Sequence, residues 1–155
     1  MKKITVERPE KVLCYLDLGK NSYYMVEYAH QLAGWINAEL YFLHAVTDIR
    51  GAAGFYVPHI NTDRLENDVT RSARDKMYAV CSEVIGEVDS SMRIIRKGAP
   101  LEVINQVVEE MSIELVILGH ESSKGTLASF RSDYVERFLR QPACPFLVVP
   151  FKEAG

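Results

Sequence analysis

The stretch of the sequence with the clearest potential for chemistry is residues 117–125, ILGHESSKG. An apolar run ends there in Gly119, small and hydroxyl-bearing residues follow, and a helix is expected from Tyr134. Loops of this kind hold phosphate groups, because glycine lets backbone N–H groups approach an anion and a helix start adds partial positive charge. The question is whether this loop binds a phosphate.

The charges of this loop argue against a tightly bound phosphate. Asp133 is predicted as the N-cap of the following helix, and Glu136 three residues later completes a capping box. Lys124 and Arg131 only balance Glu121 and Asp133. A carboxylate 4 Å from a phosphate repels it by about 1 kcal/mol in water and about 4 kcal/mol at an effective dielectric of 20. That repulsion removes roughly one to three decades of affinity.

Alternating strands and helices must position this loop. The predicted strands cover residues 11–16, 40–46, 91–96, 114–119 and 146–151. The predicted helices begin near Ser22, at a Thr62 cap, at Pro100 and at Tyr134. A strand followed by a helix throughout indicates parallel strands with right-handed crossovers. The fold class is therefore α/β: a single domain over residues 1–155, with a doubly wound five-stranded sheet of order 3-2-1-4-5 and helices on both faces, Rossmann-like.

The second helix is predicted to be long and to stop near Gly86. Its apolar residues recur at about four-residue steps and predict one continuous buried stripe, made of Leu65, Val69, Ala73, Met77, Cys81 and Val84.

This strand order also predicts where a ligand would bind. The chain reverses direction across the sheet between strands one and four, and ligands of such sheets bind in the crevice beyond the carboxyl ends of the strands. Asp17 ends the first predicted strand and Gly119 ends the fourth. The loop is therefore expected at this crevice.

Five segments are similar to the corresponding segments of universal stress proteins, in the same order and with compatible spacing. They are VLCYLDLGKNS, LYFLHAV, KGAPLEVI, ELVILGH and CPFLVVP, and together they span nearly the whole chain. The chain thus resembles the universal stress protein family. The resemblance implies a stress-response role and, in the members that bind ATP, an adenine nucleotide at the crevice.

Those ATP-binding members carry a glycine, two residues, a second glycine, nine residues, and then a glycine followed by serine or threonine. In this sequence the four positions fall on Gly119, Ser122, Ser132 and Asp133. Serine restricts positive φ but can donate its hydroxyl, so Ser122 and Ser132 weaken such a site. Asp133 repels a phosphate. The resemblance therefore implies a degenerate nucleotide site.

The adenine end of the site is closer to the family pattern. Asp17 matches the aspartate that accepts from adenine or ribose groups; alternatively, it is a turn residue that satisfies the N–H of Gly19 or Lys20. Val46 lies where the family presents backbone to the base. His120 is either a ligand contact or a partly exposed loop residue. No cofactor is required, and ATP or the weaker ligand AMP would bind if the site is retained.

Composition and motifs argue against several classes of protein. The chain has 155 residues, of which 25% are charged, with a net charge of -3, so it lacks the positive field of a nucleic-acid binder. No apolar run is long enough to cross a membrane, and we expect a cytoplasmic protein. The cysteines and histidines have no metal-ligand spacing, and we expect no metal and buried cysteines. The sequence also lacks the GxSxG, GxxxxGK[ST] and HExxH motifs of enzymes.

Two further segments suggest contacts. Residues 47–61 form a long connection and a candidate lid. The last strand would expose an apolar edge, and pairing with its copy would cover that edge. We therefore predict a homodimer through Phe146, Leu147, Val148 and Val149.

Two functions follow from these observations. The first is a non-catalytic stress-response module that is dimeric, acts on unidentified protein partners and does not bind ATP tightly. The second is an adenine-nucleotide switch or slow ATPase of the same family.

Overall fold

A five-stranded parallel sheet forms the centre of the molecule. The computed structural model describes residues 2–47, 61–121 and 133–151. The strands are β1 (Lys11–Tyr15), β2 (Glu39–Val46), β3 (Arg93–Lys97), β4 (Leu115–Glu121) and β5 (Phe146–Phe151). They are ordered β3-β2-β1-β4-β5 and every neighbouring pair is parallel. The predicted fold class and strand order are confirmed.

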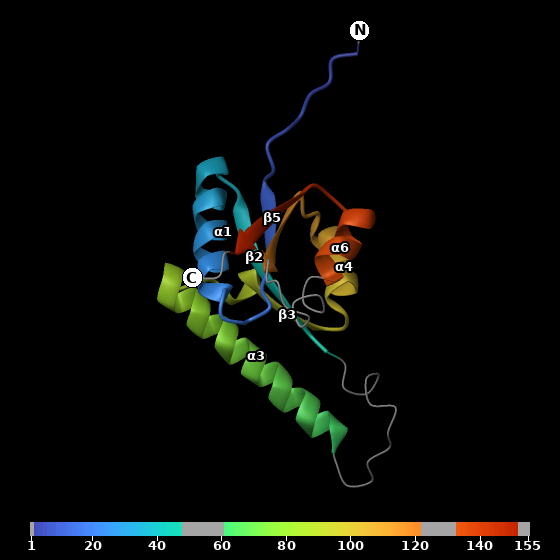
Figure 1. The fold of residues 1–155 in the computed structure, drawn as a ribbon. Coiled ribbons are helices and arrows are strands. Elements are labelled where there is room, and N and C mark those ends of the chain that lie inside the picture. The colour runs from blue at the N-terminus through green and yellow to red at the C-terminus, as the bar shows by residue number, and fades with distance from the viewer. Residues whose placement is uncertain (1, 48–60, 122–132, 152–155) are drawn as a thin grey trace.

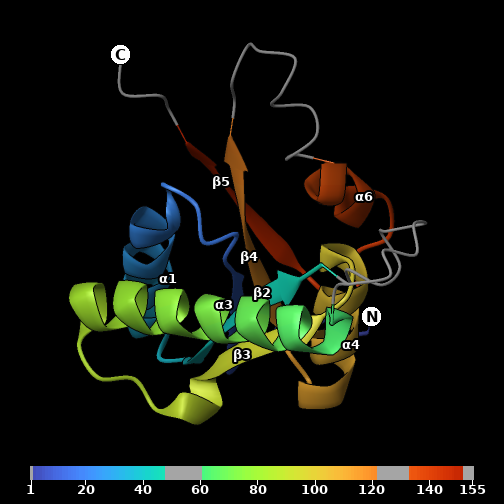
Figure 2. The ribbon, with the colours of Figure 1, turned by 90° about the horizontal axis from the view of Figure 1, so that it is seen from below.

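Helices cover both faces of this sheet (Figure 1). Helices α1 (Ser22–Ile36) and α3 (Thr62–Ile85) pack on one face, and α4 (Pro100–Met111) and α6 (Asp133–Arg140) pack on the other. Figure 2 shows α3 lying across the strands beside α1. The first turns of α3 extend past the strands, near the end of β2 (Figure 1).

Strand β1 shows why the sequence makes a sheet with two covered faces. Its odd and even residues enter different cores: Cys14 faces α1 and α3, whereas Leu13 and Tyr15 face α4 and α6. All three side chains are buried. A central parallel strand covered on both faces must be apolar at nearly every position, which is the pattern that predicted it.

Helix α3 is packed along only part of its length. Met77 and Cys81 are buried, but Leu65 and Val69 remain 39% and 37% exposed. The prediction of one continuous buried stripe is therefore wrong for the first turns. The physical reason is that in these turns Glu66 takes the buried position: it is 7% exposed and pairs with Lys97 at the end of β3, while Val69 borders an open hollow beside the end of β2.

The predicted cap of α3 is also wrong. Asn61, not Thr62, is the N-cap, and its side-chain oxygen accepts from the backbone N–H of Arg64 at 3.2 Å. Asn and Thr are both good N-cap residues, so the sequence alone does not choose between adjacent candidates. The end of the helix is as predicted, with Gly86 at the C-cap at φ 77°.

Two strand boundaries differ from the prediction by two residues, and the others by one residue at most. Strand β3 begins at Arg93 and not at Ser91, because Ser90–Met92 form a 3-10 turn capped by the side chain of Asp89. Strand β4 continues beyond Gly119 to Glu121, because β5 pairs with it from Val116 to Glu121. The second difference changes the environment of Gly119.

The three cysteines are free thiols. Cys14 and Cys81 are buried as predicted, and Cys144 is partly buried. Burial raises the pKa of Cys81 to about 11 and raises that of Cys14 further. In the part of the chain that the structure describes, no helix is long and apolar enough to span a membrane, and no three potential metal ligands cluster.

Candidate ligand cleft

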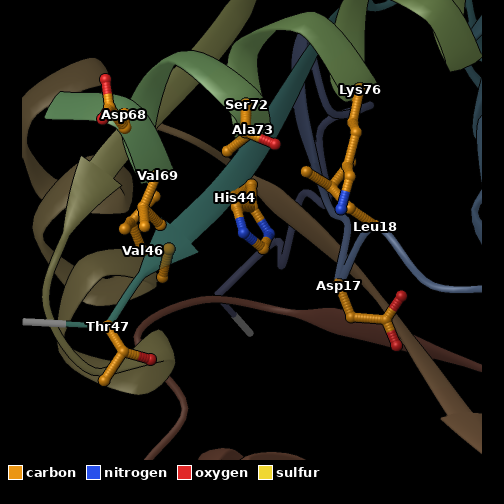
Figure 3. A pocket seen from close by; sticks show the side chains of 11 residues that line it. Asp17, Leu18, His44, Val46, Thr47, Asp68, Val69, Ser72, Ala73 and Lys76 are labelled. Carbon is orange, nitrogen blue, oxygen red and sulfur yellow. The ribbon is translucent and has the colours of Figure 1, made fainter. Parts of the chain in front are cut away.

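Several hollows lie near the carboxyl ends of the strands, and one of about 380 Å³ is lined by Asn21, Tyr24, Pro150 and Phe151. The two that contain Asp17 differ greatly in size. The larger, which we call the α3 cleft, has a volume of about 540 Å³. It opens between the ends of β1 and β2 and the side of α3 (Figure 3). Its lining residues are Asp17, Leu18, His44, Ala45, Val46, Thr47, Asp68, Val69, Ser72, Ala73 and Lys76. Its volume is within the usual range of small-molecule sites.

The turn after β1 places Asp17 in this cleft. Its Oδ1 accepts from the backbone N–H of Gly19 at 2.8 Å and from the Ser22 hydroxyl at 3.5 Å. The turn alternative for Asp17 is therefore present, and Oδ2 remains as a second acceptor. Leu18, which lies between Asp17 and Gly19, has φ 59°, a left-handed conformation that is unusual for a bulky residue. Such strain persists only where the surroundings hold it, and Leu18 packs against the α1 and α3 core.

Val46 and His44 supply the β2 side of the cleft. The Val46 carbonyl accepts from the backbone N–H of Gly98 at 2.9 Å, which leaves one lone pair of that oxygen. His44 Nδ1 lies 2.7 Å from the Leu16 carbonyl oxygen. A carbonyl only accepts, so Nδ1 carries the proton and Nε2 is the acceptor of the neutral ring.

Burial keeps His44 neutral. It lowers the pKa of His44, and this effect outweighs the hydrogen bond to Leu16 and the charge of Asp17, both of which favour the imidazolium. Lys76 acts in the same direction as burial. The ring also stacks on Tyr15, with centroids 6.3 Å apart and planes inclined by 22°. His44 thus presents a positioned, uncharged acceptor.

Helix α3 contributes polar residues that the sequence analysis did not single out. Asp68, Ser72 and Lys76 recur every four residues, so they share one side of the helix and line the cleft together. Figure 3 shows Lys76 reaching down from α3 toward Leu18, with its amine directed to the end of β1 above Asp17. Their four-residue spacing beside the apolar stripe was the available signal.

The smaller hollow lies where a phosphate was expected, between the ends of β1 and β4. This β1–β4 crevice has a volume of only about 20 Å³, room for about one water molecule. Its lining residues are Tyr15, Leu16, Asp17, Asn21, Ser22, Met25, Gly119, Glu121, Tyr134 and Phe151. Among the described residues, the aromatic side chains of Tyr15, Tyr134 and Phe151 line this crevice and leave little space in it.

The absence of a side chain at Gly119 allows this close packing of the crevice. A Cβ at Gly119 would lie 2.6 Å from Cε2 and 2.7 Å from Cζ of Phe151, and 3.3 Å from Sδ of Met25. The glycine therefore makes room for the ring of Phe151. Its carbonyl accepts from the Tyr134 hydroxyl at 3.2 Å, so α6 is tied to the same point.

Charge and hydrogen bonding close the crevice further. Lys20 Nζ lies 3.0 Å from Glu121 Oε1 and links the turn after β1 to the end of β4. The rings of Tyr15 and Tyr134 lie 5.3 Å apart. Burial raises the pKa of Tyr15 to about 12 and also raises that of Tyr134, so both phenols are neutral at pH 7. Lys20, the cation beside the end of β4, is already paired with Glu121.

The structure separates the residues of the predicted nucleotide site. Asp17 lines both hollows: it meets Val46 in the α3 cleft and Gly119 in the crevice, so only Val46 and Gly119 are apart. His120 lines neither hollow, and its Nδ1 is buried without a hydrogen-bond partner among the described residues.

The remaining predicted positions belong to the loop and the helix start. Ser122 and Ser132 lie outside the described residues, as do residues 48–60 of the predicted lid. Asp133 is described by its backbone alone and is the first residue of α6. The prediction that it precedes the helix as N-cap is therefore shifted by one residue, a common uncertainty at helix ends.

Solved structures with this fold include proteins of one family. A universal stress protein in complex with cAMP has 19% identity and a TM-score of 0.53, covering 93% of this chain and 98% of its own. A universal stress protein family member from Burkholderia pseudomallei has 19% identity and a TM-score of 0.65, with coverages of 92% and 96%. MJ0577, a protein whose biochemical function was assigned from its structure, has 21% identity and a TM-score of 0.65, with coverages of 96% and 100%.

Similarity at this level of identity shows the fold, and the sequence model of a family gives the stronger assignment. No curated protein matches the sequence significantly. The model of the universal stress protein family matches residues 9–150, which is nearly the whole chain. The chain therefore belongs to the universal stress protein family.

Proposed function

We propose that this chain is a non-catalytic stress-response module that binds an adenine nucleoside or mononucleotide in the α3 cleft and does not bind ATP tightly. One observation carries the proposal: the cleft that contains Asp17 and Val46 has a volume of about 540 Å³, whereas the crevice expected for the phosphates has about 20 Å³. A nucleoside fits a cavity of the first size. Among the described residues, the second leaves no room for a triphosphate chain.

The lining of the cleft suits a base and a sugar. Asp17 Oδ2 can accept from a ribose hydroxyl or a base amino group while Oδ1 keeps the turn bond to Gly19. The Nδ1–H of His44 is committed to Leu16, so its Nε2 can accept another N–H or O–H. Leu18 and Val69 supply apolar contacts for a ring. A universal stress protein in complex with cAMP supports an adenine ligand for this fold.

We propose that the chain does not hydrolyse its ligand. In the described part of the β1–β4 crevice, the groups nearest a transferred phosphate would be the Tyr134 phenol and the Glu121 carboxylate. Burial raises the pKa of Tyr134, and Glu121 pairs with Lys20. Neither group provides the free positive charge that stabilises phosphoryl transfer.

The test compares ligands and variants by calorimetry and thermal shift, using adenosine, AMP and ATP, each with and without magnesium. Adenosine should bind saturably, and stabilisation should follow RT ln(1 + [L]/Kd), or roughly 2.7 kcal/mol at a hundredfold excess over Kd. Asp17→Asn keeps an oxygen for the Gly19 N–H but removes the charge, so it should weaken adenosine about tenfold with little loss of stability.

Asp75→Asn is the matched control for that variant. Asp75 is an exposed carboxylate on α3 that does not line the cleft, so its substitution should leave adenosine affinity unchanged. Binding of ATP more tightly than adenosine, or no binding of adenosine at millimolar concentration, would refute the proposal.

We also propose that the module is a homodimer through β5, which is an edge strand of the sheet. The backbone N–H of Val116 donates to the carbonyl of Pro145. In a parallel ladder alternate residues bond to one neighbour, so the N–H groups of Phe146 and Val148 point away from β4. Pro150 falls on the same outward phase, where its missing N–H removes no bond to β4.

Sedimentation of the purified protein at micromolar concentration tests the dimer. Val148→Pro removes an N–H that points away from β4 and should shift the protein toward monomer. Leu147→Ile changes a residue whose N–H points toward β4 and should leave the dimer intact. A strict monomer for the unaltered chain would refute this part of the proposal and leave the ligand proposal standing.

A further inference from the structure

Lys76 differs from the other cations near the carboxyl ends of the strands. Lys20 is paired with Glu121 at 3.0 Å and Lys97 with Glu66 at 2.9 Å. Within the described residues Lys76 forms no ion pair, although it lines the α3 cleft beside two carboxylates. Its amine points into the cleft from α3 (Figure 3). An unpaired ammonium in a cavity is available to an anionic ligand group.

The described lining has one positive charge and two negative charges. Lys76 provides the former, and Asp17 and Asp68 provide the latter. His44 adds no charge near neutral pH, because burial lowers its pKa. The first negative charge of a ligand can therefore contact Lys76, whereas the described lining offers each additional charge no second cation and two carboxylates. Repulsion by a carboxylate a few ångströms away lowers affinity by about one decade or more in a partly screened site.

We propose that the α3 cleft selects its ligand by charge, with Lys76 as the specificity-determining residue, and that it favours a nucleotide with a single negative charge over uncharged nucleosides and over nucleotides with two or more charges. This inference rests on the proposed adenine site. A phosphodiester such as that of a cyclic nucleotide has one charge at every pH near neutrality. A monophosphate ester is mostly doubly charged at pH 7, because its second pKa is about 6.

The geometry of α3 explains how one helix both attracts and limits charge. Asp68 lies two turns before Lys76 on the same side of the helix, with Ser72 between them. Ser72 lines the cleft one turn before Lys76, and its hydroxyl can donate to a ligand there. A longer phosphate chain directed along α3 would approach Asp68, and one directed toward β1 would approach Asp17.

Calorimetry at pH 7.5 and low salt with adenosine, cyclic AMP, AMP and ATP provides the test. Cyclic AMP should bind about five- to tenfold more tightly than adenosine, and AMP and ATP should bind more weakly than cyclic AMP. In Lys76→Gln, cyclic AMP should fall to the affinity of adenosine while adenosine itself changes less than about twofold. Lys76→Arg should restore most of the difference, because it keeps the charge.

Two further variants separate a local effect from a general one. Asp68→Asn should strengthen AMP more than cyclic AMP, because it removes a repulsion felt mainly by the second charge. Arg74→Gln removes an exposed cation of α3 that does not line the cleft and should change none of the affinities. Melting temperatures of all variants should stay close together, since the three side chains are exposed.

The outcomes distinguish this inference from the function on which it rests. If adenosine and cyclic AMP both fail to bind, the adenine site is wrong and the charge selection is overturned with it. If adenosine binds but Lys76→Gln leaves the ratio of cyclic AMP to adenosine unchanged, only the charge selection is overturned. Tighter binding of AMP or ATP than of cyclic AMP would also overturn it.

Discussion

The α3 cleft and the β1–β4 crevice lie at the same end of one sheet and share Asp17, yet they have about 540 Å³ and about 20 Å³ of space. Topology alone favours the crevice, because the chain reverses across the sheet there. Side chains reverse that preference: Phe151 and Tyr134 fill the crevice, whereas α3 stands away from the ends of β1 and β2. The position of a site in a fold and the space within it are separate properties.

The largest expected effect comes from breaking the close approach of Gly119 to Phe151. In Gly119→Ala the added methyl would overlap the ring, so the ring must move out of the crevice. We expect the free energy of unfolding to fall by about 1–3 kcal/mol, the usual cost of overpacking. Urea denaturation measures this loss.

A second substitution shows whether the ring is the cause. Phe151→Leu should be less damaging in the Gly119→Ala background than in the unaltered chain, because the shorter side chain leaves room for the methyl. If the effects of the two substitutions on the free energy of unfolding are additive, the contact between residue 119 and Phe151 is not the source of the lost stability. Adenosine affinity should change in neither case, since neither residue lines the α3 cleft.

A smaller effect is expected from the hydrogen bond that ties α6 to β4. Tyr134→Phe removes the hydroxyl that donates to the Gly119 carbonyl and keeps the ring that packs on Tyr15. The free energy of unfolding should fall by about 0.5–1.5 kcal/mol. Thermal or urea unfolding is the measurement, and a loss of ligand binding in the α3 cleft would contradict the separation of the two regions.

The smallest effect concerns the pH dependence of stability through His44. Because burial lowers its pKa in the folded protein, the unfolded chain takes up a proton first as the pH falls below the ordinary value of about 6.5. Its contribution to stability is therefore present above that pH and is lost as the pH falls toward the folded pKa. His44→Asn, whose amide can still donate to Leu16, should reduce this slope in unfolding measured between pH 7.5 and 5. An unchanged slope would mean that groups other than His44 cause this pH dependence of stability.

Much of the fold was predictable because its signals are local. The apolar run around Cys14 and the stretch before Gly119 have the composition of strands covered on both faces. Pro100 marks the first turn of α4 and Gly86 the end of α3, each for a backbone reason that holds in any fold. Strand order then followed from the alternation of strands and helices.

The candidate site was less predictable because it depends on distant pairs. Asp17 and Val46 were identified, but Asp68, Ser72 and Lys76 were not, since only the path of α3 across the strand ends brings them to the cleft. Gly119 was interpreted as a position for close approach of a phosphate. It is a position of close approach, but the group that approaches is the ring of Phe151, from a strand more than thirty residues further along the chain.

The sequence by itself determined the family, the order of the strands and the departure from the ATP-binding motif, because each depends on residue types at fixed spacing along the chain. The tertiary structure decided that, among the described residues, the α3 cleft is spacious and the β1–β4 crevice is not. That outcome depends on how α3 lies over the ends of β1 and β2 and on how Tyr134 and Phe151 pack around Gly119 of β4. Packing joins residues whose separation in the sequence carries no signal of their contact.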